Sequence, residues 1–315
     1  MLVTTIDEYS ERQWEQLKAA VPGSQVHLEP DLTNSRLALD RTEILVTYGF
    51  DVTEENLRRL PALKWVQVFQ SGIEHVPVAA LAERGILLTN VKGIHGVPMA
   101  EYVMSYVLYV TRDMKRFERD KQKRLWNRSD LVGEVKGKTM VIFGAGTIGM
   151  EVAKKAKAFG MRVIGVNTSG ERREPFDEMV KLDEKLQVLS RGDFIVMLLP
   201  VTEETFHCIG ADELRSMNRE ACLLNIGRGA LVDTEALVDA LRNRTIRGAA
   251  LDVFEDDPLP PEHPLWTFDD VFLTPHLAAK TVNYLDRCLE KFAVNVDRYR
   301  NGEPLLNQVD EKKGY

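Results

Sequence analysis

Apolar residues recur in short runs along the chain, and stretches with the helical spacing of apolar residues separate these runs. Runs of this kind, rich in Val, Ile and Leu, are typical of buried strands. The first series of predicted strands is Leu2–Thr4, 25–28, 44–48, 65–69 and 87–90, with helices predicted at 53–60 and 78–84. The second series is Thr139–Phe143, 162–166, 194–199, 221–226, 248–253 and 271–274.

Alternation of strands and helices favours parallel sheets, because a crossover segment must connect two parallel neighbours. Two such series predict two sheets. We therefore expect an α/β protein with two Rossmann-like or flavodoxin-like doubly wound domains and a cleft between them.

Two long helical patterns lie outside this alternation. One runs over about 98–121, with Pro98 suited to a first helical position, and a polar, loop-like segment follows it. The other lies near the end of the chain, where Tyr284, Leu289 and Phe292 share one helical face. This last helix needs an apolar surface, and we expect it to return to the first sheet. The predicted domains are 1–93 with 281–315, which is discontinuous, and 94–280.

Composition excludes several classes of protein. The length of 315 residues suits two domains, and a net charge of −7 without a long basic run argues against nucleic acid as a partner. No run approaches the ~18 apolar residues of a membrane span, and the first residues lack a signal-peptide pattern. Cys208, Cys222 and Cys288 are too scattered for a disulfide framework or a zinc site, which favours a reducing cytoplasm. The histidines suggest no metal site.

A glycine-rich turn is the strongest local signal. The predicted strand Thr139–Phe143 runs directly into Gly144, Gly146 and Gly149 in the pattern G-x-G-x-x-G, and a helical pattern follows. The first glycine permits the tight turn, the second permits close approach of a pyrophosphate, and the third permits helix–strand packing. The helix N-terminus attracts the phosphates. We interpret the turn, including Thr147 and Ile148, as a dinucleotide site.

The next strand should end in a residue that contacts the adenosine ribose, about 20 residues further on. That position is Asn167, which has no charge to repel a 2′-phosphate. Thr168, Ser169 and Arg172, followed by Arg173, are candidate phosphate partners. This pattern tilts the cofactor prediction toward NADP, with NAD as the other possibility. The alternative is that the two arginines belong only to a solvated loop.

Five ordered motifs together resemble the D-isomer-specific 2-hydroxyacid dehydrogenases. They are the glycine turn at 143–149, M-L-L-P-V-T-E-E-T at 197–205, N-I-G-R-G-A-L-V-D at 225–233, A-L-D-V-F-E-D-D-P at 250–258 and L-T-P-H-L-A-A at 273–279. The glyoxylate/hydroxypyruvate reductases resemble the chain most, notably at 264–266 and 274–279. The resemblance implies that 94–280 binds the dinucleotide and that the discontinuous domain binds the substrate.

Reduction of a 2-oxo acid needs a cation for the carboxylate and carbonyl, a proton donor, and an anion that keeps the donor protonated. Arg228 suits the first role because guanidinium grips carboxylate bidentately, and two glycines flank it after a predicted strand. His276 suits the second because imidazole titrates near neutral pH. Taken alone, each could be a surface arginine or a structural histidine.

The anion is where the chain departs from the family. The family usually has Glu directly before the proline of the fourth motif, and this chain has Asp257. Asp is one methylene shorter, so its contact with His276 could be longer or bridged by water. Glu255 and Asp256 are neighbouring alternatives whose register matches less well. We predict that Asp257 is the catalytic carboxylate that partners His276.

The resemblance implies further binding residues. Asp252, Asn225 and the backbone around Ile226 and Gly227 would hold the nicotinamide carboxamide, with His276 and Ala278 close to the cofactor. A second set would form the wall beside the cofactor, namely Leu198, Pro200 and Thr205. Backbone amides of Ser71 and Gly72 would bind the substrate carboxylate.

The expected activity is hydride transfer between NAD(P)H and a small 2-oxo acid, with a D-2-hydroxy acid as the product. Relatives that pair through the region 98–126 lead us to expect a homodimer. The corepressors called C-terminal-binding proteins share the fold as NAD(H)-gated binding modules, and they are the alternative. A formate-type dehydrogenase would carry Gln beside the proline, and Asp257 argues against it. The side chain of the substrate is not encoded by these motifs.

Overall fold

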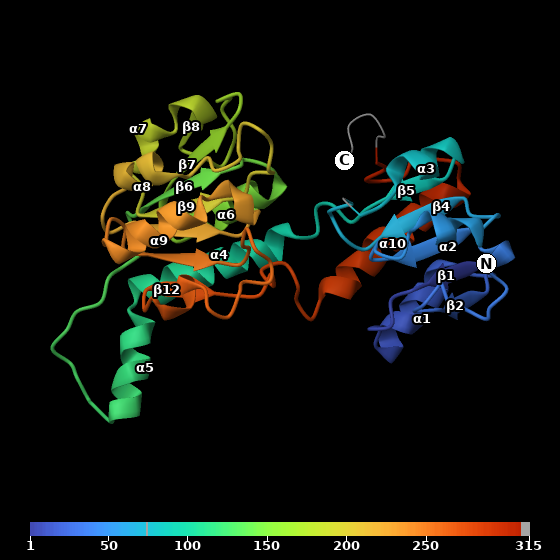
Figure 1. The fold of residues 1–315 in the computed structure, drawn as a ribbon, viewed down its shortest axis with the longest axis horizontal. Helices are drawn as coiled ribbons and strands as arrows, with labels where there is room; N and C mark the ends of the chain where they lie inside the picture. The colour runs from blue at the N-terminus through green and yellow to red at the C-terminus, as the bar shows by residue number, and fades with distance from the viewer. Residues whose placement is uncertain (74, 310–315) are drawn as a thin grey trace. The chain divides into compact units, whose positions relative to one another are not determined.

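The computed structural model describes residues 1–73 and 75–309, and the chain divides into two compact units (Figure 1). One unit comprises Met1–Ile94 and Val282–Tyr315, and the other comprises His95–Thr281. Each unit is built on a parallel β-sheet. The predicted fold class, α/β with two doubly wound parallel sheets, is confirmed.

The first unit has a five-stranded sheet with the strand order β2-β1-β3-β4-β5. Its strands are β1 (Leu2–Thr4), β2 (Val26–Leu28), β3 (Ile44–Thr47), β4 (Trp65–Val68) and β5 (Leu87–Thr89). The helices that flank this sheet are α1 (Glu11–Ala20), α2 (Glu54–Arg58), α3 (Val78–Glu83) and α10 (Tyr284–Arg300).

The C-terminal helix α10 packs against α1 and on this sheet. Its residues Leu289, Phe292 and Val296 share a buried cluster with Leu2 and Trp65. The indole of Trp65 stacks on the ring of Phe292, with centroids 5.3 Å apart. The apolar face at the end of the chain thus completes the unit that begins with the N-terminal strand.

The second unit has a seven-stranded parallel sheet with the strand order β12-β11-β10-β9-β6-β7-β8. Its strands are β6 (Thr139–Phe143), β7 (Arg162–Asn167), β8 (Glu178–Lys181), β9 (Phe194–Met197), β10 (Cys222–Asn225), β11 (Gly248–Leu251) and β12 (Val271–Leu273). The order reverses between β6 and β9, and ligands of doubly wound sheets bind at such a switch point.

Helices cover both faces of this second sheet. Helices α4 (Gly96–Thr111) and α6 (Thr147–Ala158) pack on one face, and α7 (Leu186–Leu189), α8 (Ala211–Ser216) and α9 (Thr234–Arg242) pack on the other. Every residue of β9, β10 and β11 is buried. Burial on both faces explains why these strands read as continuous apolar runs without alternation.

Two sequence-based expectations differ from the structure. The single helix predicted over 98–121 is two helices, α4 and α5 (Met114–Lys123), separated at Arg112 and Asp113. Asp113 has a left-handed φ of 52°, a conformation that Asp adopts more readily than most residues and that ends the helix. The edge strand β8 was not predicted, because its sequence Glu-Met-Val-Lys is short and only partly buried.

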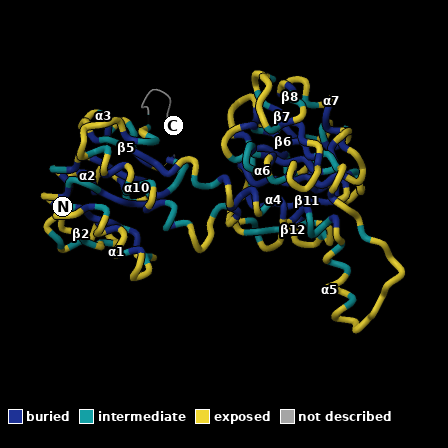
Figure 2. The backbone as a smooth tube through the Cα atoms, turned by 180° about the vertical axis from the view of Figure 1, so that it is seen from behind, coloured by how far each residue is buried: buried dark blue, intermediate teal, exposed yellow. Residues whose placement is uncertain are grey.

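Helix α5 and the loop after it extend away from the rest of the second unit (Figure 2). We call residues 114–134 the arm. No residue of α5 is buried, and the loop exposes 89% of Trp126 and 95% of Leu131. The arm therefore presents large apolar side chains to solvent. None of the helices within 1–73 and 75–309 is long and apolar enough to cross a membrane.

Candidate active site

The predicted site residues of the second unit lie at the ends of six neighbouring strands. They end or follow β6, β7, β9, β10, β11 and β12, which are adjacent in the sheet order. Because all these strands are parallel, their carboxyl ends meet at one edge of the sheet. The fold therefore gathers at this edge five motifs that are far apart in the sequence.

The glycine turn has the geometry of a phosphate-binding loop. Gly144 has a φ of 110°, and a Cβ on Gly149 would lie 2.0 Å from the carbonyl oxygen of Gly144. A Cβ on Gly146 would meet nothing within 4 Å, and Gly146 precedes the first turn of α6 without a side-chain cap. The first and third glycines are therefore required by the protein, whereas the second leaves open space at a helix N-terminus. This cradle fits the pyrophosphate of a dinucleotide.

The loop after β7 is organised by Asn167. Its Oδ1 accepts hydrogen bonds from the backbone N–H of Ser169 and Gly170, at 3.1 and 2.6 Å. Arg172 is exposed, with Nη2 3.9 Å from Oε1 of Glu174. The neighbouring Arg173, in contrast, donates from Nη1 to the carbonyl oxygen of Ala145 at 3.0 Å. The arginine that reaches the glycine turn is thus Arg173 rather than Arg172.

The imidazole of His276 contacts the predicted carboxylate. His276 Nδ1 lies 3.2 Å from Asp257 Oδ2, and both side chains are about half exposed. The shorter Asp therefore reaches the histidine directly. The alternative Glu255 contacts a different histidine, with Oε1 2.6 Å from His207 Nε2, and also accepts a hydrogen bond from Thr234 N. Burial acts to raise the pKa of Glu255, but these hydrogen bonds outweigh it and lower the pKa below its ordinary value.

Asp252 is buried directly behind the His276 turn, with 2% of the residue exposed. Its Oδ1 accepts hydrogen bonds from Thr274 Oγ1 at 2.5 Å and from Leu277 N at 2.8 Å. Its Oδ2 accepts from Ala278 N at 2.8 Å, and its carbonyl oxygen accepts from His276 N at 2.9 Å. Asp252 thus shapes the backbone on both sides of the histidine.

Arg228 lies in the loop after β10, and its side chain is exposed. Asn225 Nδ2 donates to the carbonyl oxygen of Arg228 at 2.9 Å, which holds this loop. A Cβ on Gly229 would lie 1.9 Å from the carbonyl oxygen of Phe254, so only glycine fits there. The loop that carries Arg228 therefore packs closely against the loop that leads to Asp257.

The remaining predicted residues have structural contacts of their own. Leu198 N donates to the carbonyl oxygen of Phe143, and Thr205 Oγ1 donates to the carbonyl oxygen of Pro200 at 2.7 Å. Ser71 and Gly72 follow β4 in the first unit, where Asn90 Nδ2 donates to the carbonyl oxygen of Ser71 at 3.0 Å. Within the described ranges, no group of three or more His, Cys, Asp or Glu could hold a metal ion.

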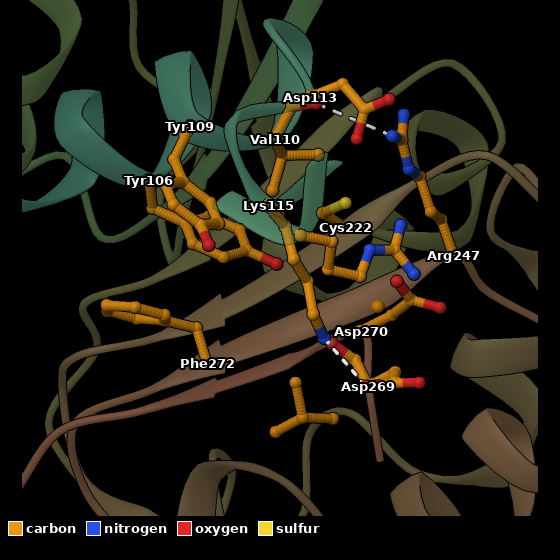
Figure 3. Close-up of a pocket in the computed structure, with 13 residues that line it drawn as sticks. Tyr106, Tyr109, Val110, Asp113, Lys115, Cys222, Arg247, Asp269, Asp270 and Phe272 are labelled. Atoms are coloured by element: carbon orange, nitrogen blue, oxygen red, sulfur yellow. Dashed lines mark hydrogen bonds and ion pairs between the residues drawn. The ribbon is translucent and has the colours of Figure 1, made fainter. Parts of the chain in front are cut away.

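A pocket of about 230 Å³ lies at the opposite edge of the second sheet, where β10, β11 and β12 begin (Figure 3). Tyr106, Tyr109 and Phe272 line one part of it. Lys115 on the arm reaches Asp269, with Nζ 3.0 Å from Oδ1. Nothing in the local sequence distinguishes these aromatic residues from ordinary core residues, so the pocket is visible only in the structure. Its position at the amino ends of the strands separates it from the candidate active site.

Fold and site together define an oxidoreductase that uses NAD or NADP. A family model described as "D-isomer specific 2-hydroxyacid dehydrogenase, NAD binding domain" matches residues 104–278. A glyoxylate reductase of Thermofilum pendens is 35% identical over 293 residues, which cover 88% of this chain and 85% of that protein. The chain belongs to the D-isomer-specific 2-hydroxyacid dehydrogenase family.

Solved structures agree with this assignment. A D-isomer-specific 2-hydroxyacid dehydrogenase family protein of Aeromonas salmonicida has a TM-score of 0.88 and 32% identity, with 98% of both chains covered. An NADPH-dependent glyoxylate/hydroxypyruvate reductase of Sinorhizobium meliloti, solved with NADP and sulfate, has a TM-score of 0.80 and 28% identity, with all of this chain and 99% of that chain covered.

Proposed function

We propose that this protein reduces a small 2-oxo acid of the glyoxylate or hydroxypyruvate kind to the D-2-hydroxy acid. The observation that carries the proposal is the contact between His276 and Asp257 at the sheet edge that also holds the glycine turn. The relatives quoted above are named as reductases or dehydrogenases, which favours an enzyme over an NAD(H)-gated binding module.

His276 is proposed as the proton donor. Its Nδ1 faces Asp257, so Nε2 is the nitrogen left to deliver a proton to the carbonyl oxygen of the substrate. Asp257, in contact with Nδ1, would orient the ring so that Nε2 faces the substrate. NAD(P)H, when bound, supplies the hydride.

Arg228 is proposed to bind the substrate and stabilise the charge that develops on its oxygen. A guanidinium presents paired N–H donors that match a 2-oxo acid, whose carboxylate and carbonyl oxygens lie in one plane. Electrostatic stabilisation of this kind usually contributes most to the rate. In the first unit, the backbone amides of Ser71 and Gly72 would bind the substrate carboxylate.

The proposed roles of the two parts follow the predicted domains. Residues 94–280 would bind the dinucleotide, in agreement with the family model, and 1–93 with 281–315 would bind the substrate. The proposed contacts to the pyrophosphate are Gly144, Gly146, Thr147, Ile148 and Gly149. The proposed contacts to the nicotinamide half are Leu198, Pro200, Thr205, Asn225, Ile226, Gly227, Asp252, His276 and Ala278.

NADP is the proposed preferred cofactor. Asn167 places no negative charge at the end of β7, and a carboxylate there would repel a 2′-phosphate. Thr168, Ser169 and Arg172 remain the proposed 2′-phosphate partners, and Arg173 adds a cation held against the glycine turn. The Sinorhizobium meliloti relative is named as NADPH-dependent, which supports this preference.

A second copy of the chain is the proposed partner of the arm. Trp126 and Leu131 are almost fully exposed, and the pocket at the root of the arm offers aromatic residues together with both signs of charge. Such a surface can pair with the same surface of a second copy across a two-fold axis, because each arm can cover the other copy.

A cytoplasmic location is also proposed, since the three cysteines are free and buried.

A substrate panel tests the proposed activity. NADPH and NADH oxidation would be followed with glyoxylate, hydroxypyruvate, pyruvate and branched 2-oxo acids, and the configuration of each chiral product would be determined. We expect the highest kcat/KM with glyoxylate or hydroxypyruvate and NADPH, and D-glycerate from hydroxypyruvate. An L-product, or no oxidation with any 2-oxo acid, would contradict the proposal.

A further inference from the structure

The turn that carries His276 has an unfavourable backbone conformation. His276 has a φ of 54°, in the left-handed region that residues with a Cβ rarely adopt. Such a conformation persists only where the surroundings hold it firmly. The surroundings here are the hydrogen bonds that the backbone N–H groups of 276–278 donate to Asp252.

Asp252 is itself held by a hydroxyl chain that begins on another element. Thr274 Oγ1 donates to Asp252 Oδ1 at 2.5 Å. Tyr102 Oη, on α4, lies 2.6 Å from Thr274 Oγ1. Because the Thr274 proton is committed to Asp252, Tyr102 must be the donor in the second bond. Burial raises the pKa of Tyr102 to about 12, so the phenol keeps its proton at neutral pH.

These two hydrogen bonds connect α4, the first helix of the second unit, with the turn that follows the edge strand β12. Tyr102 lies in the second turn of α4, whereas Thr274 directly follows β12. The two residues are 172 positions apart in the sequence, and a single pair of hydroxyl groups joins them. A hydrogen bond between hydroxyls fixes the rotamers of both side chains, which apolar packing alone would leave less defined.

We propose that Tyr102 and Thr274 are positioning residues for His276, acting through Asp252. The proposal rests on the proposed function, since it concerns the donor of that reaction. Neither hydroxyl needs to touch the substrate. Their role is to orient the buried carboxylate, which then holds the backbone of the turn and thereby aims the imidazole.

Four variants test the two hydrogen bonds between Tyr102, Thr274 and Asp252. Tyr102→Phe and Thr274→Val each remove one hydroxyl at nearly constant volume, and the double variant closes a double-mutant cycle. Thr274→Ser keeps the hydroxyl and should restore function. The matched control is Tyr9→Phe, because Tyr9 Oη and Thr4 Oγ1 form a similar pair, 3.3 Å apart, in the first unit.

We expect kcat for the 2-oxo acid to fall about three- to tenfold in Tyr102→Phe, the usual worth of one hydrogen bond. Thr274→Val should lose about ten- to a hundredfold, because it also leaves the Tyr102 phenol and an oxygen of Asp252 without this partner. The double variant should be no slower than Thr274→Val, since the two hydroxyls act in series. Additive losses, or a Thr274→Ser variant as slow as Thr274→Val, would overturn the proposal.

A readout that does not depend on turnover separates this proposal from the proposed function. The ring signals of His276 can be assigned by NMR from the signal that is lost in His276→Asn, and then compared among the variants at constant pH. Positioning predicts that these signals shift or broaden in Tyr102→Phe and Thr274→Val but not in Tyr9→Phe. Unchanged His276 signals would refute positioning even if activity fell, whereas a wild-type protein without turnover would refute only the proposed function.

Discussion

At the scale of single residues, the proposed reaction depends on a short carboxylate. Asp257 has one methylene fewer than the glutamate usual in the family, yet its Oδ2 lies 3.2 Å from His276 Nδ1. About half of each side chain is exposed. Water screens an exposed pair of this kind, so we expect it to contribute little to folding. Its value would lie in the orientation of the imidazole during the reaction.

Removal of the charge on Asp257 gives the first prediction. Asp257→Asn should lower kcat/KM about ten- to a hundredfold, which is the usual contribution of a positioned acid–base partner. The reason is that the imidazole loses the carboxylate that orients it through Nδ1. Asp256→Asn changes the neighbouring exposed carboxylate and serves as the control. A kcat/KM of Asp257→Asn equal to that of the wild type would remove Asp257 from the mechanism.

The sequence motifs indicate the reactive residues of the candidate site better than they indicate the residues that hold them in place. Asp257 and His276 stand in recognisable motifs, and the structure brings their side chains together. Arg173 could not be distinguished from Arg172, because adjacent loop residues differ only in the direction that the fold gives them. The role of Tyr102 was not visible either, since a tyrosine among the apolar residues of a helix reads as core.

At the scale of elements, the glycines in the turn from β6 into α6 have different roles. Gly149 is required by the protein, because a Cβ there would collide with the carbonyl oxygen of Gly144. Gly146 has open space around its Cβ position, so its lack of a side chain benefits a ligand instead. The helical pattern of apolar residues was less accurate for the region after α4. It predicted one helix where Asp113 separates α4 from α5.

The two glycines give a matched pair of variants. Gly149→Ala should lower the free energy of unfolding by about 1–3 kcal/mol through overpacking against the backbone. Gly146→Ala should cost about 1 kcal/mol or less in stability but weaken NADPH binding about tenfold or more, because the methyl group occupies the pyrophosphate space. Thermal denaturation and the quenching of tryptophan fluorescence by NADPH measure the two effects. Equal NADPH affinity in Gly146→Ala and the wild type would contradict this placement of the cofactor.

At the scale of the whole molecule, the two series of strands predicted the two sheets. Periodicity succeeded here because both sheets are parallel and covered by helices, so each strand is a short apolar run between helical patterns. The sequence alone could not indicate which apolar residues would remain uncovered. The residues adjacent to Trp126 and Leu131 in the sequence do not indicate that these two side chains are exposed. Their exposure is seen only in the folded arm.

The arm gives the prediction for assembly. Trp126→Asp combined with Leu131→Asp should shift the protein from dimer to monomer in light scattering, because two charges would be placed in the apolar part of the interface. Val282→Asp is the matched control, since Val282 is 92% exposed and lies outside the arm. A wild-type protein that is monomeric, or a double variant that still dimerises at the same concentration, would contradict the proposed role of the arm.

Hydride transfer in a single turnover tests the central claim most directly. Wild-type protein saturated with NADPH would be mixed with glyoxylate and compared with His276→Asn, after NADPH binding has been measured for both. We predict rapid NADPH oxidation in the wild type and, with both proteins saturated with NADPH, a rate lower by about a hundredfold or more in the variant. Transfer at the same rate in both proteins would show that His276 is not the proton donor.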